Sequence, residues 1–192
     1  MKTISLLSVI AAVAIAIGLK ALAAEPADKG DAPIFLSEVP QGYRDWKLIA
    51  VSRLTTSNGS SPAAKPDTPK SGSQLRAELG NDIAVKAYRE GKLPFPDGAI
   101  VVAIHWEEVS SEKNNEVIAE GFPGAGIQSF VPGSGLNMQV MVKDSKKYAA
   151  TGGWGFGDFT HGKPSDEKVM QTCFTCHTPA KDHDFVFTRY AP

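Results

Sequence analysis

Apolar and polar side chains alternate along several stretches of the chain, as they do in strands that bury one face. We predict strands at residues 46–54, 99–109, 127–131, 136–144, 154–159 and 184–192. The stretch 111–134 around the third of these is otherwise rich in turn-forming residues. The pattern therefore indicates about five strands of a mainly antiparallel sheet.

One stretch follows the helical period instead. Apolar residues recur every four positions at Leu75, Leu79, Ile83 and Ala87. A helix is therefore predicted over 73–92, ending near Gly91, although Gly80-Asn81-Asp82 could divide it into two shorter helices. A second, short helix is predicted at 165–173 with Ser165 as its N-cap. The fold class that follows is α+β, a mainly antiparallel sheet with a few helices on one face or end.

The N-terminus has the pattern of a secretory signal. Lys2 precedes an apolar run, and small residues at Ala21 and Ala23 suit a cleavage site. Removal of residues 1–23 would leave 24–192 as a single domain. A membrane anchor is the alternative, but the apolar run is short for a bilayer span. Residues 55–73 are rich in Ser, Pro, Gly and Thr, and we predict a flexible loop there.

Composition narrows the classes of function only a little. The chain has 192 residues, 42% of them hydrophobic and 21% charged, which is ordinary for one globular domain. Its formal net charge is −1 at pH 7, so there is no electrostatic reason to expect a nucleic-acid partner. After removal of the signal, no membrane association is expected.

The most informative motif contains both cysteines of the chain, Cys173 and Cys176, and the residue after them, His177. Cys-x-x-Cys-His is the attachment pattern of c-type haem. The two thiols add to the haem vinyl groups, and the adjacent imidazole supplies an iron ligand. Two alternatives stay open, namely a disulfide or redox dithiol in an exported protein and a zinc site, which needs about four ligands.

Five segments in this order resemble the cytochrome P-460 family, to which cytochrome c′-beta is related. They are residues 43–51, 88–102, 141–159, 173–177 and 184–192. The resemblance implies a mainly antiparallel β fold with helices, often a homodimer, in the periplasm. It also implies one covalent haem c per chain, with a histidine on one side of the iron and an open or apolar pocket on the other.

Two positions depart from what the family implies. Members with a modified chromophore oxidise hydroxylamine and bond a lysine to the haem ring, whereas cytochrome c′-beta members bind nitric oxide. The lysine is expected six positions after the Asp of the Asp97-Gly98 turn, and this chain has Ala103 there. Gln139 stands where a pocket carboxylate is expected. These two departures from the family pattern favour an ordinary haem c in this chain.

Several side chains are candidates for the other face of the iron, namely His105, Met138, Met141 and Lys143. Ala103 and His105 fall on one face of their strand, so His105 is expected near the haem edge if Ala103 faces the haem. A solvated or hydrogen-bonded strand histidine is the alternative for His105. Met138 and Met141 fall on opposite faces, so only one of them can face the pocket, and core packing is their alternative.

Other candidates concern the walls of the pocket. Phe156 and Trp154 share a strand face and are candidates for an apolar wall, with sheet packing as the alternative. Arg44 and Arg189 are candidates for pairing with haem propionates, with solvation at the surface as the alternative. His161 and His183 are expected to be solvated in polar loops.

Three functions remain in view. The first is a protein that binds nitric oxide or another small gaseous or N-oxide ligand. The second is an electron carrier with a periplasmic redox partner, which needs a six-coordinate iron. The third is an oxidoreductase acting on hydroxylamine or another N-oxide, against which Ala103 argues.

Overall fold

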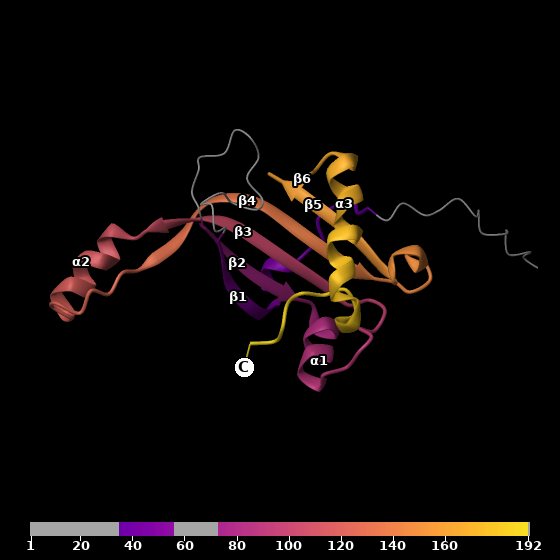
Figure 1. Cartoon of the computed structure of the whole chain (residues 1–192), viewed down its shortest axis with the longest axis horizontal. Helices are drawn as coiled ribbons and strands as arrows, with labels where there is room; N and C mark the ends of the chain where they lie inside the picture. Colours follow the sequence, from indigo (N-terminus) through magenta and orange to yellow (C-terminus); the bar gives the residue numbers. More distant parts are fainter. Residues whose placement is uncertain (1–34, 56–72, 192) are drawn as a thin grey trace, which may run out of the picture. The chain divides into compact units, whose positions relative to one another are not determined.

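Antiparallel strands form one sheet in the computed structural model of the chain, which describes residues 35–55 and 73–191. Within that part the strands are β1 (Lys47–Thr55), β2 (Ser73–Gly80), β3 (Ile100–Ser110), β4 (Phe130–Lys143), β5 (Trp154–Thr160) and β6 (Lys163–Pro164). Each strand pairs with its neighbour in the sequence, in the order β1-β2-β3-β4-β5-β6 (Figure 1). The predicted signal, residues 1–23, and most of the predicted loop, residues 56–72, lie outside the described residues.

The helices are α1 (Asp82–Glu90), α2 (Glu112–Gly121) and α3 (Glu167–His177), and the short 3₁₀ turns are η1 (Tyr43–Asp45), η2 (Ala149–Thr151) and η3 (Thr178–His183). α3 crosses one face of the sheet, with α1 beyond one end of it (Figure 1). This arrangement confirms the predicted α+β class. No helix of the described part is long and apolar enough to cross a bilayer.

The main core lies between the sheet and the helices. Ala84 and Val85 of α1 pack in one cluster with Val101 of β3, Phe156 of β5 and Val186 of the C-terminal segment. All five are at most 5% exposed. Burying a valine or phenylalanine side chain contributes about 1.5–3 kcal/mol. A smaller cluster around Val102, Val140 and Phe159 occupies the opposite face of the sheet.

The predicted helix 73–92 is wrong over its first half, because 73–80 is the strand β2. The backbone turns at Gly80, where a Cβ atom would lie 2.7 Å from Cδ1 of Ile49. Asn81 then caps α1, its side chain accepting a hydrogen bond from the Ala84 amide at 3.0 Å. The helix ends at Gly91, which has a φ of 60°, so this part of the prediction is confirmed.

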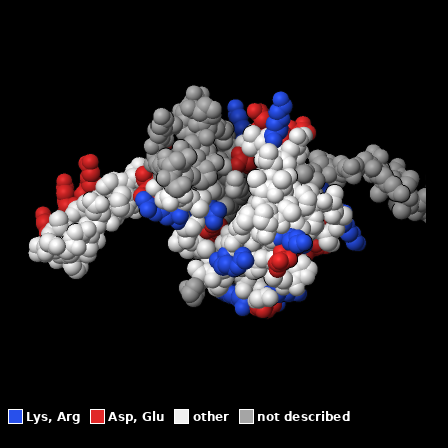
Figure 2. Space-filling model, in the orientation of Figure 1, with Lys and Arg blue, Asp and Glu red and all other residues white. Residues whose placement is uncertain are grey.

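The stretch 111–134 contains the helix α2, which the turn-rich pattern did not predict. The strand predicted at 127–131 is wrong over residues 127–129, and its last two residues belong with the strand predicted at 136–144 to the single strand β4. The ends of β3 and β4 extend beyond their neighbours and carry α2 as an arm (Figure 1). Acidic side chains project from α2 (Figure 2), and none of its residues is buried.

The predicted strand at 184–192 is also wrong, because the described part of this tail has no strand. Asp184 and Phe185 have positive φ values of 51° and 64°, which break an extended backbone. The tail nevertheless follows β1, where the amide of Ala191 donates to the carbonyl of Ile49 at 2.9 Å. At the ends of the predicted loop, Thr55 and Ser73 belong to strands.

Candidate functional site

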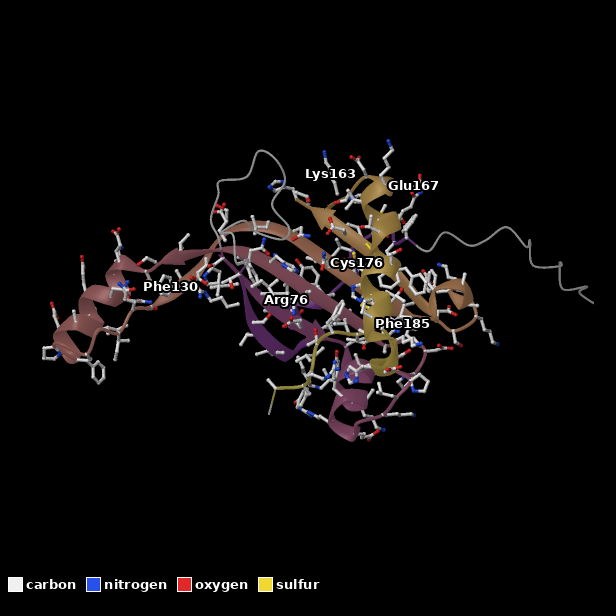
Figure 3. The ribbon with its side chains drawn as sticks, in the orientation of Figure 1. Arg76, Phe130, Lys163, Glu167, Cys176 and Phe185 are labelled. Atoms are coloured by element: carbon white, nitrogen blue, oxygen red, sulfur yellow. The ribbon has the colours of Figure 1, made fainter. Side chains whose placement is uncertain are left out.

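A cavity of about 310 Å³ lies between the sheet and α3. Cys173, Cys176 and His177 line it from the helix, and Ala103 and Gln139 line it from the sheet. Figure 3 labels Cys176 on α3, which crosses the sheet. The fold therefore brings the Cys-x-x-Cys-His motif together with Ala103 and Gln139 in the walls of one cavity.

The helical geometry of α3 sets the direction of the motif. Positions separated by three and four residues share a helix face, so Cys173, Cys176 and His177 are displayed together. Both cysteines are free thiols. Burial raises the pKa of Cys173 to about 11. The predicted helix at 165–173 is confirmed and continues through the motif to His177.

The start of α3 differs from the prediction. Asp166 is the N-cap residue, and its side chain makes no capping hydrogen bond. The hydroxyl of Ser165 donates instead to the carboxylate of Asp158 on β5. The predicted Ser165 cap is therefore wrong, because this side chain ties the helix to the sheet.

His177 is held by a backbone carbonyl. Its Nδ1 lies 2.7 Å from the carbonyl oxygen of Phe185. A carbonyl only accepts, so Nδ1 carries the proton and Nε2 keeps its lone pair. Burial lowers the pKa of His177, which favours this neutral ring. The rings of Phe156 and Phe187 lie 5.2 and 5.0 Å from the imidazole, centroid to centroid.

A buried ion pair fixes the segment that supplies this carbonyl. The ammonium of Lys143 lies 2.7 and 2.9 Å from the two carboxylate oxygens of Asp184. The same carboxylate accepts from the amide of Phe95 at 2.8 Å. The Lys143 and Asp184 side chains are 5% and 8% exposed. Lys143, a candidate iron ligand by sequence, therefore supports the segment that holds His177 and does not line the cavity.

The absence of a side chain at Gly152 leaves the space that the ring of Phe185 occupies. A Cβ atom on Gly152 would lie 2.1 Å from Cε2 of the Phe185 ring. Gly152 also has a φ of 67°, which side chains disfavour. The contact explains why residue 152 must be small for the Phe185 carbonyl to reach His177.

Across the sheet wall, four residues form one row on adjacent strands. Glu78 pairs with Ala103, Ala103 with Gln139, and Gln139 with Asp158. The position expected for a lysine and the position expected for a carboxylate are thus direct cross-strand neighbours. Glu78 and Asp158, 1% and 6% exposed, flank them. Burial raises the pKa of Glu78 despite its ion pair with Arg76.

The candidate iron ligands on β3 and β4 lie on the two faces of the sheet, as their positions along the strands predict. His105 and Met141 line the cavity. Met138 packs in the cluster on the opposite face of the sheet, which confirms that the two methionines face opposite ways. Phe156 lines the cavity as an apolar wall, whereas Trp154 is a core residue whose ring lies 5.0 Å from Nζ of Lys143.

Neither arginine predicted for haem propionates lines this cavity. Arg44 lies over the ring of Tyr43, 5.2 Å from its centroid, and borders a different pocket. Arg189 donates to the carbonyls of Val186 and Phe187 at 3.1 and 3.0 Å. Both guanidinium groups therefore make local contacts away from the cavity. The arginine that does line the cavity is Arg76 of β2, labelled in Figure 3.

Sequence reasoning missed Gln74, Arg76 and Glu78, because it assigned 73–80 to a helix. Their alternation with Leu75, Ala77 and Leu79 was the available signal.

Two other histidines lie away from the cavity. His161 is exposed as expected, but His183 is half-buried, with its Nε2 buried and unpaired, so its predicted solvation is wrong.

The arrangement fits a c-type haem. Two thiols and an imidazole lone pair occupy one helix face, and Val101, Met141 and Phe156 provide apolar surface for a flat macrocycle. Polar groups on the same wall, including His105, are available to a small ligand. Within residues 35–55 and 73–191, no group of three or more His, Cys, Asp or Glu side chains is placed to hold a metal ion.

Comparison with known proteins identifies a family. The model of the family described as Cytochrome P460 matches residues 40–188. This range includes both walls of the cavity and the segment that holds His177. No curated protein matches the chain.

Proposed function

Because the chain belongs to the cytochrome P460 family, we propose that it is a mono-haem c-type cytochrome that binds nitric oxide or a similar small ligand. The family implies the haem cofactor. The observation that carries the proposal is the cavity itself. Cys173, Cys176 and His177 line one wall of it, and a small Ala103 lines the other.

The attachment residues would act from α3. The thiols of Cys173 and Cys176 would form thioether bonds with the two haem vinyl groups. His177 would present Nε2 to the iron, since its Nδ1 proton is engaged by Phe185. The bound haem supplies an iron atom with coordination positions and one-electron redox chemistry. The carbonyl fixes the ring orientation, as outer partners of metal-bound histidines commonly do.

The sheet wall favours ligand binding over oxidation. Ala103 has no amine to bond to the haem ring, and residue 139 is an amide where a carboxylate is expected. The carboxylate that remains on this wall, Asp158, accepts from Asn137 and Ser165. Phe156 and Met141 make the adjacent wall apolar, which excludes water from this part of the cavity. These features support a ligand site with an unmodified haem c.

A second candidate function, electron transfer, is favoured by one observation. Met141 and His105 both line the cavity from the sheet, and either side chain is of a type that can complete a six-coordinate iron. The two functions differ in whether a ligand can reach the iron. We place the protein in the periplasm as part of the proposal, on the secretory pattern of residues 1–23.

One titration tests the proposal. The holoprotein, made in a host with haem-attachment machinery, is reduced without oxygen and titrated with nitric oxide while its spectrum is recorded. We expect a five-coordinate haem c spectrum that changes on addition of nitric oxide. A low-spin six-coordinate spectrum that does not respond would favour the electron carrier. A strongly red-shifted Soret band before the addition would mean a modified haem and would contradict the role given to Ala103.

A further inference from the structure

His105 lines the cavity and has a buried ring nitrogen without a partner. It lies on β3, two residues from Ala103 and on the same face of the strand. The residue is 3% exposed, and it lines the cavity opposite the motif. Its Nε2 atom is buried and has no hydrogen-bond partner among the described residues. A buried nitrogen of this kind needs a partner, and the cavity is where a ligand can provide it.

Gln74 decides which ring nitrogen of His105 carries the proton. Nδ1 of His105 lies 3.2 Å from the side-chain oxygen of Gln74. An amide oxygen accepts but cannot donate, so Nδ1 is the protonated nitrogen. Nε2 of the neutral ring therefore carries a lone pair. The group presented to the cavity is an acceptor, not a donor.

The surroundings keep this ring neutral. Burial, followed by the charge of Arg76 on β2, lowers the pKa of His105 to about 4. Asp158 of β5 and the side chain of Gln139 oppose the shift. The other ionisable groups around the cavity are Glu78, which is paired with Arg76, and the three residues of the motif on α3. At neutral pH the ring is thus uncharged, and Nε2 keeps its lone pair.

We propose that His105 is a hydrogen-bond acceptor for the ligand, so that the site favours small ligands bearing N–H or O–H over ligands that present only lone pairs. The inference rests on the proposed function, because it requires a haem in the cavity. It deepens that proposal by ranking the ligands. A ligand with a hydrogen gains a bond to Nε2, whereas carbon monoxide meets a lone pair there.

Two measurements on the holoprotein test the role of His105. The first is the C–O stretching frequency of the reduced protein with carbon monoxide at neutral pH. A lone pair facing the ligand opposes back-donation from the iron and raises this frequency, so His105→Phe should lower it. The second is affinity. His105→Phe should weaken anaerobic binding of hydroxylamine to the oxidised protein about tenfold, the value of one hydrogen bond. It should not weaken binding of carbon monoxide.

Acidification and an isosteric variant make the test sharper. As the pH falls through about 4, Nε2 gains a proton and becomes a donor, so the C–O frequency of the wild type should fall. Gln74→Glu keeps the acceptor but adds a negative charge beside Nδ1. That charge should move the midpoint upward by about one pH unit or more. His161→Asn, at an exposed histidine, is the matched control and should behave as the wild type.

The outcomes are distinguishable. An unchanged C–O frequency in His105→Phe, or equal loss of affinity for both ligands, would overturn the inference while leaving ligand binding intact. A nitrogenous sixth ligand that disappears in His105→Phe would also overturn it, since His105 would then bind the iron itself. A holoprotein preparation without haem would contradict the proposed function, and the inference would fall with it.

Discussion

Replacing Asp184 by Asn tests whether the buried ion pair supports the haem-facing histidine. The change keeps the shape of the side chain and an oxygen that can still accept from the Phe95 amide. It removes the negative charge 2.7 Å from the Lys143 ammonium, which is buried. Removing one partner of such a pair typically costs about 3–5 kcal/mol, because the other charge stays buried without compensation.

This cost is large compared with the stability of a domain, which is typically about 5–15 kcal/mol. For a chain of this size, about 4 kcal/mol corresponds to a fall in Tm of roughly 8–16 °C. The assay is thermal unfolding of the holoprotein, followed by circular dichroism and by the Soret band. Because Asp184 precedes the residue whose carbonyl holds His177, the Soret band should change before global unfolding.

The double variant Lys143→Met with Asp184→Asn is the control. With both charges removed, no uncompensated ion remains, so the double variant should cost at least about 2 kcal/mol less than the sum of the single changes. A cost below about 1 kcal/mol for Asp184→Asn, as for an exposed pair, would refute the reasoning. Additive costs in the double variant would refute it as well.

Three further predictions concern the same site. Gly152→Ala should disturb the haem spectrum and lower Tm, because its Cβ would overlap the Phe185 ring; an unchanged spectrum would show that this ring does not depend on the glycine. Phe156→Ala should cost about 3–5 kcal/mol in chemical denaturation, since the residue is 2% exposed, and a loss below about 1 kcal/mol would contradict its place in the core. The folded-state pKa of His105, about 4 against 6.5, means that its contribution to stability is present above about pH 6.5 and is lost as the pH falls toward 4. That contribution amounts to about 3 kcal/mol. His105→Gln should flatten the pH profile in this window, and an unchanged slope would rule out this protonation effect.

The sequence was a good guide for three strands and for the start of the helix that carries the motif. The bounds of the strands β1, β3 and β5 lie within one residue of the predicted ones. A helix leading into the motif was also predicted at 165–173, and α3 extends it to His177.

The segment 73–80 shows where local pattern fails. Leu75 and Leu79 fit a helix because they are four residues apart, but they also lie on one face of a strand. Only the pairing of β2 with β1 and β3 decides between them. The error concealed Arg76, and the cavity arginine was therefore sought at Arg44 and Arg189 instead.

The support of His177 could not be predicted either. It consists of a backbone carbonyl, and any residue type can offer one. The carbonyl is placed by the left-handed backbone at Asp184 and Phe185, and by an ion pair to a strand 41 residues earlier. Residues other than glycine rarely adopt a left-handed backbone, so the sequence gives no signal for it at these two positions. A contact over this distance depends on the fold.

The central claim is that Cys173 and Cys176 hold the haem covalently, and denaturation of the holoprotein tests it most directly. The protein is unfolded, treated with acidified acetone, which extracts haem that is not covalently bound, and weighed intact by mass spectrometry. The account predicts a chain heavier by one haem, and a chain without haem in the variant with both cysteines changed to alanine. The control His161→Asn should keep its haem. Recovery of free haem from the wild type, or a mass that fits a Cys173–Cys176 disulfide alone, would contradict the account.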